Sequence, residues 1–345
     1  MNLPEKLKSF KPYPAMTGAP AVRVDGNESC FPLPPALLDE IAETVRRTDI
    51  GRYPDPYATE VCSLAEQFWG APEGSAVAGN GSDELISIAL SSLLPRGGRL
   101  LVCDPDFSMY RFYAALYELE CAGTGRYPGV PEIGEVIEKG KDADAVILSN
   151  PCNPTGQGVL PDEMLRVAES LNCPVLLDEA YMDFWDGGKH SLLPYIDRYN
   201  NLMILKTCSK NLALAGIRLG FAFCGEELSG VLRSVKSPYN VNAVTQAAGA
   251  AVLRRPDWIR DNTKRLCEAK DRLFKRLGEW ARETEGASVT DTVANFVLLT
   301  LPDAPEWHRR LQSRGVGVRL INGVLRITAG AETEQDALLA ALDKR

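Results

Sequence analysis

The stretch Asn201-Leu-Met-Ile-Leu-Lys-Thr-Cys-Ser-Lys-Asn-Leu-Ala-Leu-Ala-Gly-Ile-Arg-Leu-Gly220 joins an apolar, strand-like run to a turn that carries an amine, a hydroxyl and a guanidinium. Lys210 directly follows Ser209, and Arg218 lies further along the same segment. An amine can form a Schiff base with an aldehyde, whereas a hydroxyl and a guanidinium can bind a phosphate. The segment therefore suits pyridoxal 5′-phosphate (PLP), which carries both groups. A surface lysine and an ion-paired arginine are the plain alternative for this segment taken alone.

Apolar runs of strand length alternate with helical patterns from about residue 37 to residue 235. Runs that are apolar at every position are typical of parallel strands covered on both faces. The pattern predicts an α/β fold with a large, mostly parallel α/β/α sheet domain. The predicted buried parallel strands are residues 100–103, 145–148, 175–177, 203–205 and 219–223.

The pattern changes after Asn242. A long, highly charged helical stretch at residues 257–282 is followed by a strand at 294–300, a helix, and two strand candidates at 316–320 and 323–328. This mixture predicts a second, smaller α+β domain. We expect an N-terminal arm that includes part of the small domain (residues 1–40), a large PLP-binding domain (41–240) and a small C-terminal domain (241–345).

The composition restricts the class of protein. Of the 345 residues, 45% are hydrophobic and 24% are charged, which is typical of a soluble globular protein. The net charge of −8 argues against nucleic acid or an anionic membrane as a partner, and no run is long enough for a membrane span. The start of the chain lacks the apolar segment of a signal peptide, and the 9 cysteines form no C-x-x-C pair, so we expect a reducing cytoplasm. Only 2 histidines occur, so neither histidine catalysis nor a metal site is expected.

Polar clusters follow three of the predicted strands, at residues 150–156, 178–181 and 209–210. The carboxyl ends of parallel strands meet at one edge of a sheet, so these clusters should converge on a ligand. Asp178, at the end of an apolar strand, needs a cation, and the pyridinium nitrogen of PLP is a suitable one. Tyr181 and Asn153 could hydrogen-bond the ring hydroxyl. A helix N-cap is the alternative role for Asp178.

The turn Gly79-Asn-Gly-Ser-Asp-Glu84 precedes a helical pattern, and backbone amides at such a helix start can bind phosphate. It differs from a dinucleotide-binding turn because Glu84 occupies the position of the third glycine. Ser82 could instead, or in addition, cap the helix. Tyr110 lies at the start of another predicted helix, where it could stack on the PLP ring or pack in the core.

Taken in order, the motifs resemble those of fold-type I PLP-dependent aminotransferases and, within them, histidinol-phosphate aminotransferases. The resemblance covers nearly the whole chain. The motifs that carry it are Asp25-Gly-Asn-Glu28, Arg52-Tyr-Pro-Asp-Pro56, Gly79-Asn-Gly-Ser-Asp-Glu84, Pro105-Asp-Phe-Ser-Met-Tyr110, Asn153-Pro-Thr-Gly156, Asp178-Glu-Ala-Tyr181, Ser209-Lys210 with Arg218, and Leu325-Arg-Ile-Thr328.

The resemblance implies a role for each of these residues. Lys210 would carry PLP as a Schiff base and then move the proton, and Asp178 would pair with the ring nitrogen. The other expected cofactor contacts are Tyr181 and Asn153 at the ring hydroxyl, Tyr110 stacked on the ring, and Ser82, Asp83, Ser209 and Arg218 at the phosphate. Tyr53 would reach the same phosphate from the other subunit of a homodimer. The expected substrate-binding residues are Tyr13, Asn27, Arg319 and Arg326.

The resemblance also implies a reaction, the transamination between glutamate and imidazole-acetol phosphate that gives L-histidinol phosphate and 2-oxoglutarate. Three departures from the family pattern concern the choice of amino substrate: Ser29-Cys30, Cys152, and the short turn between Arg319 and Arg326. A threonine-phosphate decarboxylase and an aromatic or broad-specificity aminotransferase remain open on the same fold. A PLP-dependent transcription regulator is disfavoured, because the chain is acidic and only about ten residues precede the first motif.

Overall fold

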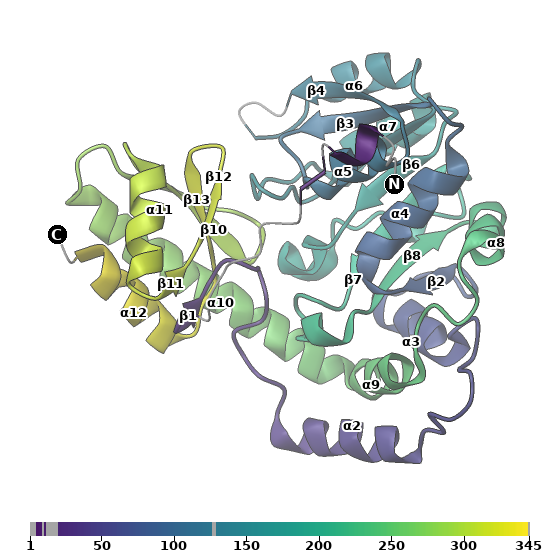
Figure 1. The fold of residues 1–345 in the computed structure, drawn as a ribbon, viewed down its shortest axis with the longest axis horizontal. Coiled ribbons are helices and arrows are strands. Elements are labelled where there is room, and N and C mark those ends of the chain that lie inside the picture. The colour runs from purple at the N-terminus through teal and green to yellow at the C-terminus, as the bar shows by residue number, and fades with distance from the viewer. Residues whose placement is uncertain (1–4, 9, 12–19, 126–128, 344–345) are drawn as a thin grey trace.

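The computed structural model describes residues 5–8, 10–11, 20–125 and 129–343. Figure 1 shows two lobes, a large one built on a seven-stranded sheet and a smaller one that contains α11 (Ala304–Ser313) and α12 (Glu332–Asp343). One predicted site residue, Tyr13, lies outside the described residues. Among the helices of the described ranges, none combines the length and the apolar composition needed to cross a membrane.

The large sheet has the strand order β2-β8-β7-β6-β5-β3-β4. The neighbours from β7 to β4 pair in parallel, which confirms the predicted α/β fold with a mostly parallel sheet. The strands are β2 (Ala76–Gly79), β3 (Arg99–Asp104), β4 (Glu120–Gly125), β5 (Ala145–Ser149), β6 (Val175–Asp178), β7 (Leu202–Thr207) and β8 (Gly220–Cys224).

The prediction that residues 219–223 form a parallel strand is wrong in its direction, because β8 pairs antiparallel with both β7 and β2. A parallel partner needs a crossover connection, usually an α-helix that packs on a face of the sheet. Residues 208–219, which join β7 to β8, contain only the short 3₁₀ helix η4 (Ala215–Ile217). The chain therefore turns back on itself, and the start of β8 lies at the same sheet edge as the end of β7.

Helices cover both faces of this sheet, so the large lobe has three layers (Figure 1). Alternate strand residues face opposite sides; in β5, for example, Val146 packs in one core and Ile147 in the other. The first core is completed by α3 (Thr59–Trp69), α6 (Ile133–Gly140), α7 (Pro161–Ser170) and α9 (Ala243–Leu253), with α2 (Pro35–Arg47) packed on α9. The second core is completed by α4 (Gly81–Leu93), α5 (Met109–Leu116) and α8 (Glu226–Val235). The shorter helices are α1 (Glu5–Lys8), η1 (Met182–Phe184), η2 (Asp186–Gly188) and η3 (Leu193–Tyr195).

The smaller lobe is the α+β domain that the sequence predicts. Its antiparallel sheet has the order β12-β13-β10-β9, and a separate parallel pair joins β1 to β11. This pair brings the N-terminal segment to the C-terminal domain. The strands are β1 (Val22–Arg23), β9 (Ser288–Thr290), β10 (Phe296–Thr300), β11 (Val316–Gly317), β12 (Arg319–Ile321) and β13 (Val324–Thr328).

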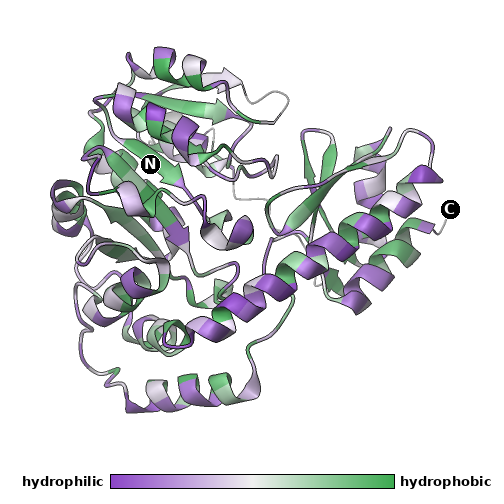
Figure 2. Cartoon of the chain, turned by 180° about the vertical axis from the view of Figure 1, so that it is seen from behind, coloured by the Kyte–Doolittle hydropathy of each residue, from purple (hydrophilic) through white to green (hydrophobic). Residues whose placement is uncertain are grey.

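The long helix α10 (Pro256–Arg282) runs from one lobe to the other, with hydrophobic and hydrophilic residues alternating along it (Figure 2). Its residue Ile259 packs in a core of the large sheet, whereas Leu273 and Leu277 pack in the core of the small domain. Val252 of α9 also packs with the large sheet. The predicted division at residues 240 and 241 stays a prediction, and these contacts favour a boundary inside α10.

Candidate active site

A cavity of about 870 Å³ lies at the carboxyl ends of the parallel strands. Ser149, Asp178 and Thr207, the last residues of β5, β6 and β7, all line it, so the polar clusters do converge. The volume is typical of a site for a small molecule or cofactor. The predicted site residues that line this cavity are Ser82, Asp83, Asn153, Asp178, Tyr181, Ser209, Lys210, Arg218, Arg319 and Arg326.

Lys210 reaches this cavity from the turn that follows β7. The turn is held by the backbone nitrogen of Ser209, which donates to Thr207 Oγ1 (3.2 Å). Lys210 Nζ donates to the backbone oxygen of Gly26 (3.0 Å) and lies 5.7 Å from the centre of the Tyr181 ring. A carbonyl oxygen carries no formal charge, so this contact holds the amine without an ion pair. The amine can leave the carbonyl for a reactive ligand.

The Asp178 carboxyl is buried at the end of β6, beside the cavity. Its Oδ2 accepts a hydrogen bond from the Tyr110 hydroxyl (2.8 Å), and its Oδ1 accepts one from the backbone nitrogen of Ala180 (3.0 Å). Burial is the main reason that the pKa of Asp178 is raised to about 6; Asp106 adds to the rise, and the two hydrogen bonds oppose it. The alternative N-cap role is wrong, because only the 3₁₀ turn η1 follows, with Tyr181 at its N-cap. A buried carboxylate in a cavity wall suits a cationic ligand group.

Tyr110 does not occupy the stacking position that the sequence predicts. Its side chain is completely buried in the core formed by α4, α5 and the sheet, and it does not line the cavity. The aromatic side chain that lines the cavity from this segment is Phe107, whose ring meets the Tyr110 ring edge to face (5.6 Å, 85°). Tyr110 lies inside α5, whereas Phe107 precedes that helix. Both aromatics were visible in the sequence, but their spacing alone did not indicate which one faces the ligand.

The start of α4 lies against Arg218. A Cβ added at Gly81 (φ 79°) would meet Arg218 Nη2 at 2.7 Å, and one added at Gly220 would meet the backbone nitrogen of Ser82 at 2.3 Å. Arg218 Nη1 also donates to Ser209 Oγ (3.4 Å). Because β8 runs antiparallel, Arg218 just before it lies beside Ser209 just after β7. A guanidinium, a hydroxyl and a helix N-terminus thus surround one point, which suits a phosphate.

Asn80 occupies the N-cap position of α4 without a side-chain cap hydrogen bond, and Ser82 lies inside the helix, so the alternative in which Ser82 caps this helix is wrong. Glu84 Oε2 accepts from the backbone nitrogen of Asn80 (2.8 Å). Asp83 Oδ2 accepts from the Tyr113 hydroxyl (2.8 Å), and burial raises the pKa of Asp83. A carboxylate repels a phosphate, so Asp83 could serve a phosphate only through its backbone amide.

Two guanidinium groups reach the cavity from the small domain. Arg319 of β12 and Arg326 of β13 are direct cross-strand partners, so their side chains lie on the same face. Arg326 is 8% exposed and donates to Asn153 Oδ1 (2.5 Å) and to the backbone oxygen of Asp25 (2.6 Å). These bonds tie the small domain to the large one at the cavity. The arrangement suits an anionic ligand group.

Asn27 does not line the cavity, which corrects the prediction of a direct substrate contact. Its side chain is completely buried, and its Nδ2 donates to the Tyr181 hydroxyl (2.8 Å). Asn27 therefore reaches the cavity only through Tyr181. The other predicted substrate residue of the N-terminal segment, Tyr13, lies outside the described residues.

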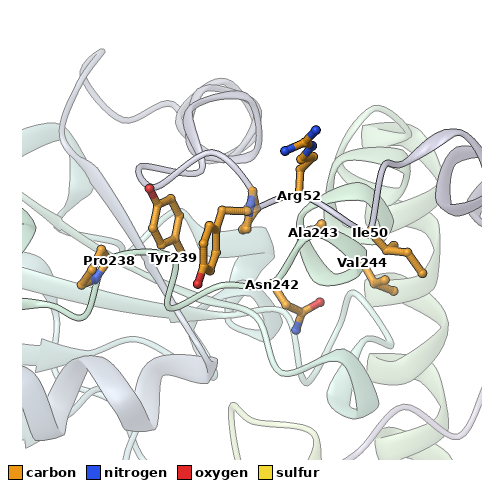
Figure 3. A pocket seen from close by; sticks show the side chains of 9 residues that line it. Ile50, Arg52, Pro238, Tyr239, Asn242, Ala243 and Val244 are labelled. Atoms are coloured by element: carbon orange, nitrogen blue, oxygen red, sulfur yellow. The ribbon is translucent and has the colours of Figure 1, made fainter.

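Tyr53 lies in a different pocket, of about 620 Å³, whose walls are shown in Figure 3. Its ring stacks on that of Tyr239 (4.5 Å between ring centres, 17° between planes) and its side chain is 80% exposed. Neither tyrosine lines the cavity that contains Lys210. A role for Tyr53 in the active site of a second subunit is compatible with this position and stays a prediction.

Two polar residues near the cavity were missed in the sequence. Asp106 lines the cavity and accepts hydrogen bonds from the backbone nitrogen (3.0 Å) and the hydroxyl of Ser149. Ser149 Oγ in turn accepts from the backbone nitrogen of Asn153 (3.2 Å), so this chain of bonds holds Asn153. The second is Lys206, which is 1% exposed within β7.

Lys206 forms a buried ion-pair cluster behind the Lys210 turn. Its Nζ lies 3.0 Å from Glu179 Oε2 and 3.2 Å from Asp183 Oδ1. Asp183 Oδ2 also accepts from Asn211 Nδ2 (3.0 Å), and Asn211 is the residue after Lys210. A lysine within an apolar strand was the only signal in the sequence, because its partner carboxylates lie elsewhere, Glu179 just after β6 and Asp183 in η1.

Comparisons with known proteins agree on one family. The family model for aminotransferase class I and II matches residues 21–344. A histidinol-phosphate aminotransferase of Thermococcus gammatolerans is 35% identical over 345 residues, which cover 99% of this chain and 96% of that protein. The crystal structure of histidinol-phosphate aminotransferase from Sinorhizobium meliloti in complex with PLP has a TM-score of 0.86 at 20% identity, covering 99% of this chain and 96% of the other. The L-threonine-O-3-phosphate decarboxylase of Porphyromonas gingivalis has a TM-score of 0.79 at 19% identity, covering 93% and 98%.

The two solved structures have low sequence identity, so they show the fold alone, which both share with this chain. Within the described part of the chain, no group of three or more His, Cys, Asp or Glu residues is placed to hold a metal ion. The family model, in contrast, spans nearly the whole sequence, including every motif that meets at the cavity. The chain belongs to the aminotransferase class I and II family.

Proposed function

We propose that this protein is a PLP-dependent aminotransferase that exchanges an amino group between glutamate and imidazole-acetol phosphate, giving L-histidinol phosphate and 2-oxoglutarate. The observation that carries the proposal is one cavity that holds an amine, a buried carboxylate, a cradle formed by Ser209, Arg218 and the start of α4, and two arginines of the small domain. The names and identities of the relatives support the choice of substrate. The reducing compartment expected for such an enzyme agrees with the nine free cysteines.

The residues around the cavity fit PLP group by group. Asp178 would pair with the ring nitrogen, and the cradle formed by Ser209, Arg218 and the start of α4 would hold the phosphate. Phe107, in place of Tyr110, would stack on the ring. When bound, PLP supplies an electrophilic carbon and a ring that accepts electrons.

The protein groups would then bind, orient and move a proton. Arg326 and Arg319 would hold the anionic end of the amino substrate, which orients its α-carbon toward Lys210. Lys210 Nζ would remove the proton from that carbon and return it on the cofactor side, since among the described residues it is the one amine that lines the cavity. Asn153, fixed by Asp106 and Ser149, would complete the polar wall at the ring hydroxyl.

Arg326→Ala is expected to raise the KM for glutamate and for the phosphorylated acceptor, because both place an anion on this guanidinium. Losing a charge-assisted contact costs about 2–3 kcal/mol, which corresponds to roughly 30- to 150-fold in kcat/KM. Steady-state kinetics with each substrate in turn provide the measurement. Arg309→Ala, which removes an exposed arginine of the same domain, is the control and should change neither KM. A rise for one substrate alone would contradict a shared anion site.

The assay that tests the proposed reaction compares amino acceptors with glutamate as donor. We expect imidazole-acetol phosphate to exceed phenylpyruvate by about a hundredfold or more in kcat/KM, since a phosphate brings nearly two negative charges and three acceptor oxygens to the two arginines, whereas the carboxylate of phenylpyruvate brings one charge. A preference for phenylpyruvate would instead identify an aromatic aminotransferase. Release of carbon dioxide from threonine phosphate, without transfer of an amino group, would identify a decarboxylase.

We also propose that the active unit is a homodimer in which Tyr53 reaches the cofactor phosphate of the partner subunit. Ile50 and Tyr53 are 74% and 80% exposed, and they line one pocket with the exposed Tyr239 and Val244. Exposed apolar side chains gathered in one region are typical of a protein interface. The pocket in Figure 3 would then open onto the second subunit.

Tyr53→Glu is expected to inactivate the enzyme, because a carboxylate at this place repels the phosphate. The decisive measurement is activity after co-refolding with Lys210→Ala, which is inactive for a different reason. If Tyr53 acts in trans, each mixed dimer has one intact site, and about a quarter of the activity should return. The control pair Lys210→Ala with Asp178→Ala should stay inactive, because both lesions belong to one chain's own site. No recovery with Tyr53→Glu would refute the trans role.

A further inference from the structure

Three consecutive residues of the N-terminal segment hold three cavity side chains. The backbone oxygen of Asp25 accepts from Arg326 Nη2 (2.6 Å), and that of Gly26 accepts from Lys210 Nζ (3.0 Å). Only the third contact is made by a side chain, from Asn27 Nδ2 to the Tyr181 hydroxyl (2.8 Å). The chemical identity of residue 27 can therefore affect the cavity through the Tyr181 hydroxyl, whereas Asp25 and Gly26 line the cavity themselves.

Asn27 is held in place by burial of its side chain and by hydrogen bonds to its backbone. Its side chain is completely buried, and its backbone is in the left-handed region (φ 52°), which asparagine tolerates better than most residues. Its backbone nitrogen donates to Thr328 Oγ1 (2.9 Å), and its backbone oxygen accepts from Asn295 Nδ2 (3.1 Å). Thr328 ends β13 and Asn295 immediately precedes β10, so the small domain holds the backbone of Asn27. Left-handed backbone at a buried non-glycine residue persists only where the surroundings impose it, commonly at functional sites.

The hydrogen bonds around Asn27 have defined directions. The Thr328 hydroxyl accepts from the backbone N–H of Asn27 through its oxygen and donates its own hydrogen to Asn27 Oδ1 (2.9 Å). The side-chain oxygen of Asn27 is then directed toward Thr328, which leaves the NH₂ group directed toward Tyr181. An NH₂ group can only donate, so the Tyr181 oxygen accepts, and its own hydrogen must point elsewhere.

The hydrogen of the Tyr181 hydroxyl is available to a ligand in the cavity. Tyr181 lines the cavity, and among the described residues the only hydrogen-bond partner of its hydroxyl is Asn27. Its ring is buried and packs edge to face against Phe296 of β10 (5.6 Å, 89°), which holds the hydroxyl in this position. A donor fixed in this way favours a ligand oxygen that carries negative charge.

We propose that Asn27 is a positioning residue that fixes Tyr181 as a hydrogen-bond donor to the ring oxygen of the cofactor. This inference rests on the proposed function, because PLP supplies that oxygen. When PLP is bound, a donor at Tyr181 would stabilise negative charge on that oxygen and would thereby favour loss of the proton from the nitrogen of Lys210. The Asn27–Tyr181 pair would therefore lower the pH at which that nitrogen loses its proton. Thr328 of the small domain would hold the pair in place.

The test uses Asn27→Asp, which keeps the size and the tolerance for φ > 0 but replaces the donor by an acceptor. Tyr181 must then donate to the introduced carboxylate, and its hydrogen is lost to the cavity. We expect the pH midpoint of the visible absorbance of the PLP-loaded protein to rise by about one pH unit, since one hydrogen bond corresponds to about that shift. The dissociation constant for PLP, measured by titration of the cofactor-free protein, should rise several-fold.

Repeating the measurement in the Tyr181→Phe background separates the effect of Asn27 that passes through the Tyr181 hydroxyl from the effect of the added charge. If Asn27 acts through Tyr181, Asn27→Asp should shift the midpoint far less in this background than in the wild type. An equal shift in both backgrounds would overturn the proposal, because the charge alone would then be responsible. Asn27→Gly is the uncharged variant that fits the same backbone, and it should raise the midpoint by a smaller amount. A lower melting temperature with an unchanged midpoint in both Asn27 variants would also overturn the proposal.

The same measurements distinguish a failure of this inference from a failure of the proposed function. A wild-type protein that binds no PLP, or binds it without a pH-dependent visible absorbance, would refute the proposed function. A wild-type protein that behaves as an aminotransferase, with Asn27 variants that leave the midpoint unchanged, would refute only the role of Asn27.

Discussion

Lys210→Ala should lower kcat by about 10⁴-fold or more, because the change removes the covalent attachment point and the proton carrier together. Lys210 lines the cavity, and its Nζ donates to the uncharged backbone oxygen of Gly26 (3.0 Å). Because this contact is not an ion pair, the amine can leave it to react with a ligand. Both steps of the proposed reaction pass through this atom. Among the described residues, Lys210 is the one lysine that lines the cavity.

The site of attachment can be measured directly. Reduction of the PLP-loaded protein with borohydride, followed by peptide mass mapping, should find the cofactor on Lys210. Lys141→Ala, which removes an exposed lysine paired with Glu138, should leave the yellow colour and kcat unchanged. Recovery of the reduced cofactor on any other lysine, for instance the buried Lys206, would disprove the assignment.

Asp178→Ala should lower kcat by about two decades or more. The variant leaves a cationic ring nitrogen without its counter-charge in a buried site, and breaking such a pair costs about 3 kcal/mol or more. It also leaves the completely buried Tyr110 hydroxyl without its acceptor. Tyr110→Phe is the matched control, because it removes that hydrogen bond and keeps the carboxylate; its kcat should fall far less. A near-normal kcat in Asp178→Ala would mean that the carboxylate is only structural.

The raised pKa of Asp178 gives a second measurement on the cofactor-free protein. The folded state holds the proton of this carboxyl up to a pKa of about 6, whereas the unfolded state releases it near 3.8. The protonated carboxyl therefore stabilises the folded state relative to the ionised one. This contribution to the free energy of unfolding is fully present below about pH 4 and is lost as the pH rises through about 6. Relative to Asp178→Asn, which does not titrate, the free energy of unfolding of the wild type should decrease over this range. Denaturant unfolding at several pH values measures the difference, and equal pH dependence in both proteins would contradict the shift.

Much of the fold followed from local patterns. The strands at residues 145–148 and 175–177 were visible as short, continuous apolar runs, because a strand covered on both faces needs an apolar residue at every position. The polar residues that follow such strands could be assigned to one ligand site for an equally local reason, since parallel strands end at the same edge. This is why Asp178 and Lys210 were found without knowledge of any contact between them.

The direction of β8 could not be read in the same way. Residues 219–223 are as apolar as the parallel strands, and the hydrophobic pattern of a buried strand is the same in either direction. Only the path of the connecting residues 208–219 decided it. The consequence is functional, because the antiparallel return brings Arg218 beside Ser209.

The sequence by itself determined the fold class, the family and the groups that carry the chemistry, because these depend on residue type and on spacing along the chain. The tertiary structure alone decided which side chain faces the ligand. Phe107 lines the cavity and Tyr110 does not, and Asn27 reaches it only through Tyr181. These outcomes depend on contacts between residues far apart in sequence, such as Asn27 with Thr328, and no local pattern encodes them. Burial and hydrogen-bond direction are properties of the packed molecule, so they could be known only from its structure.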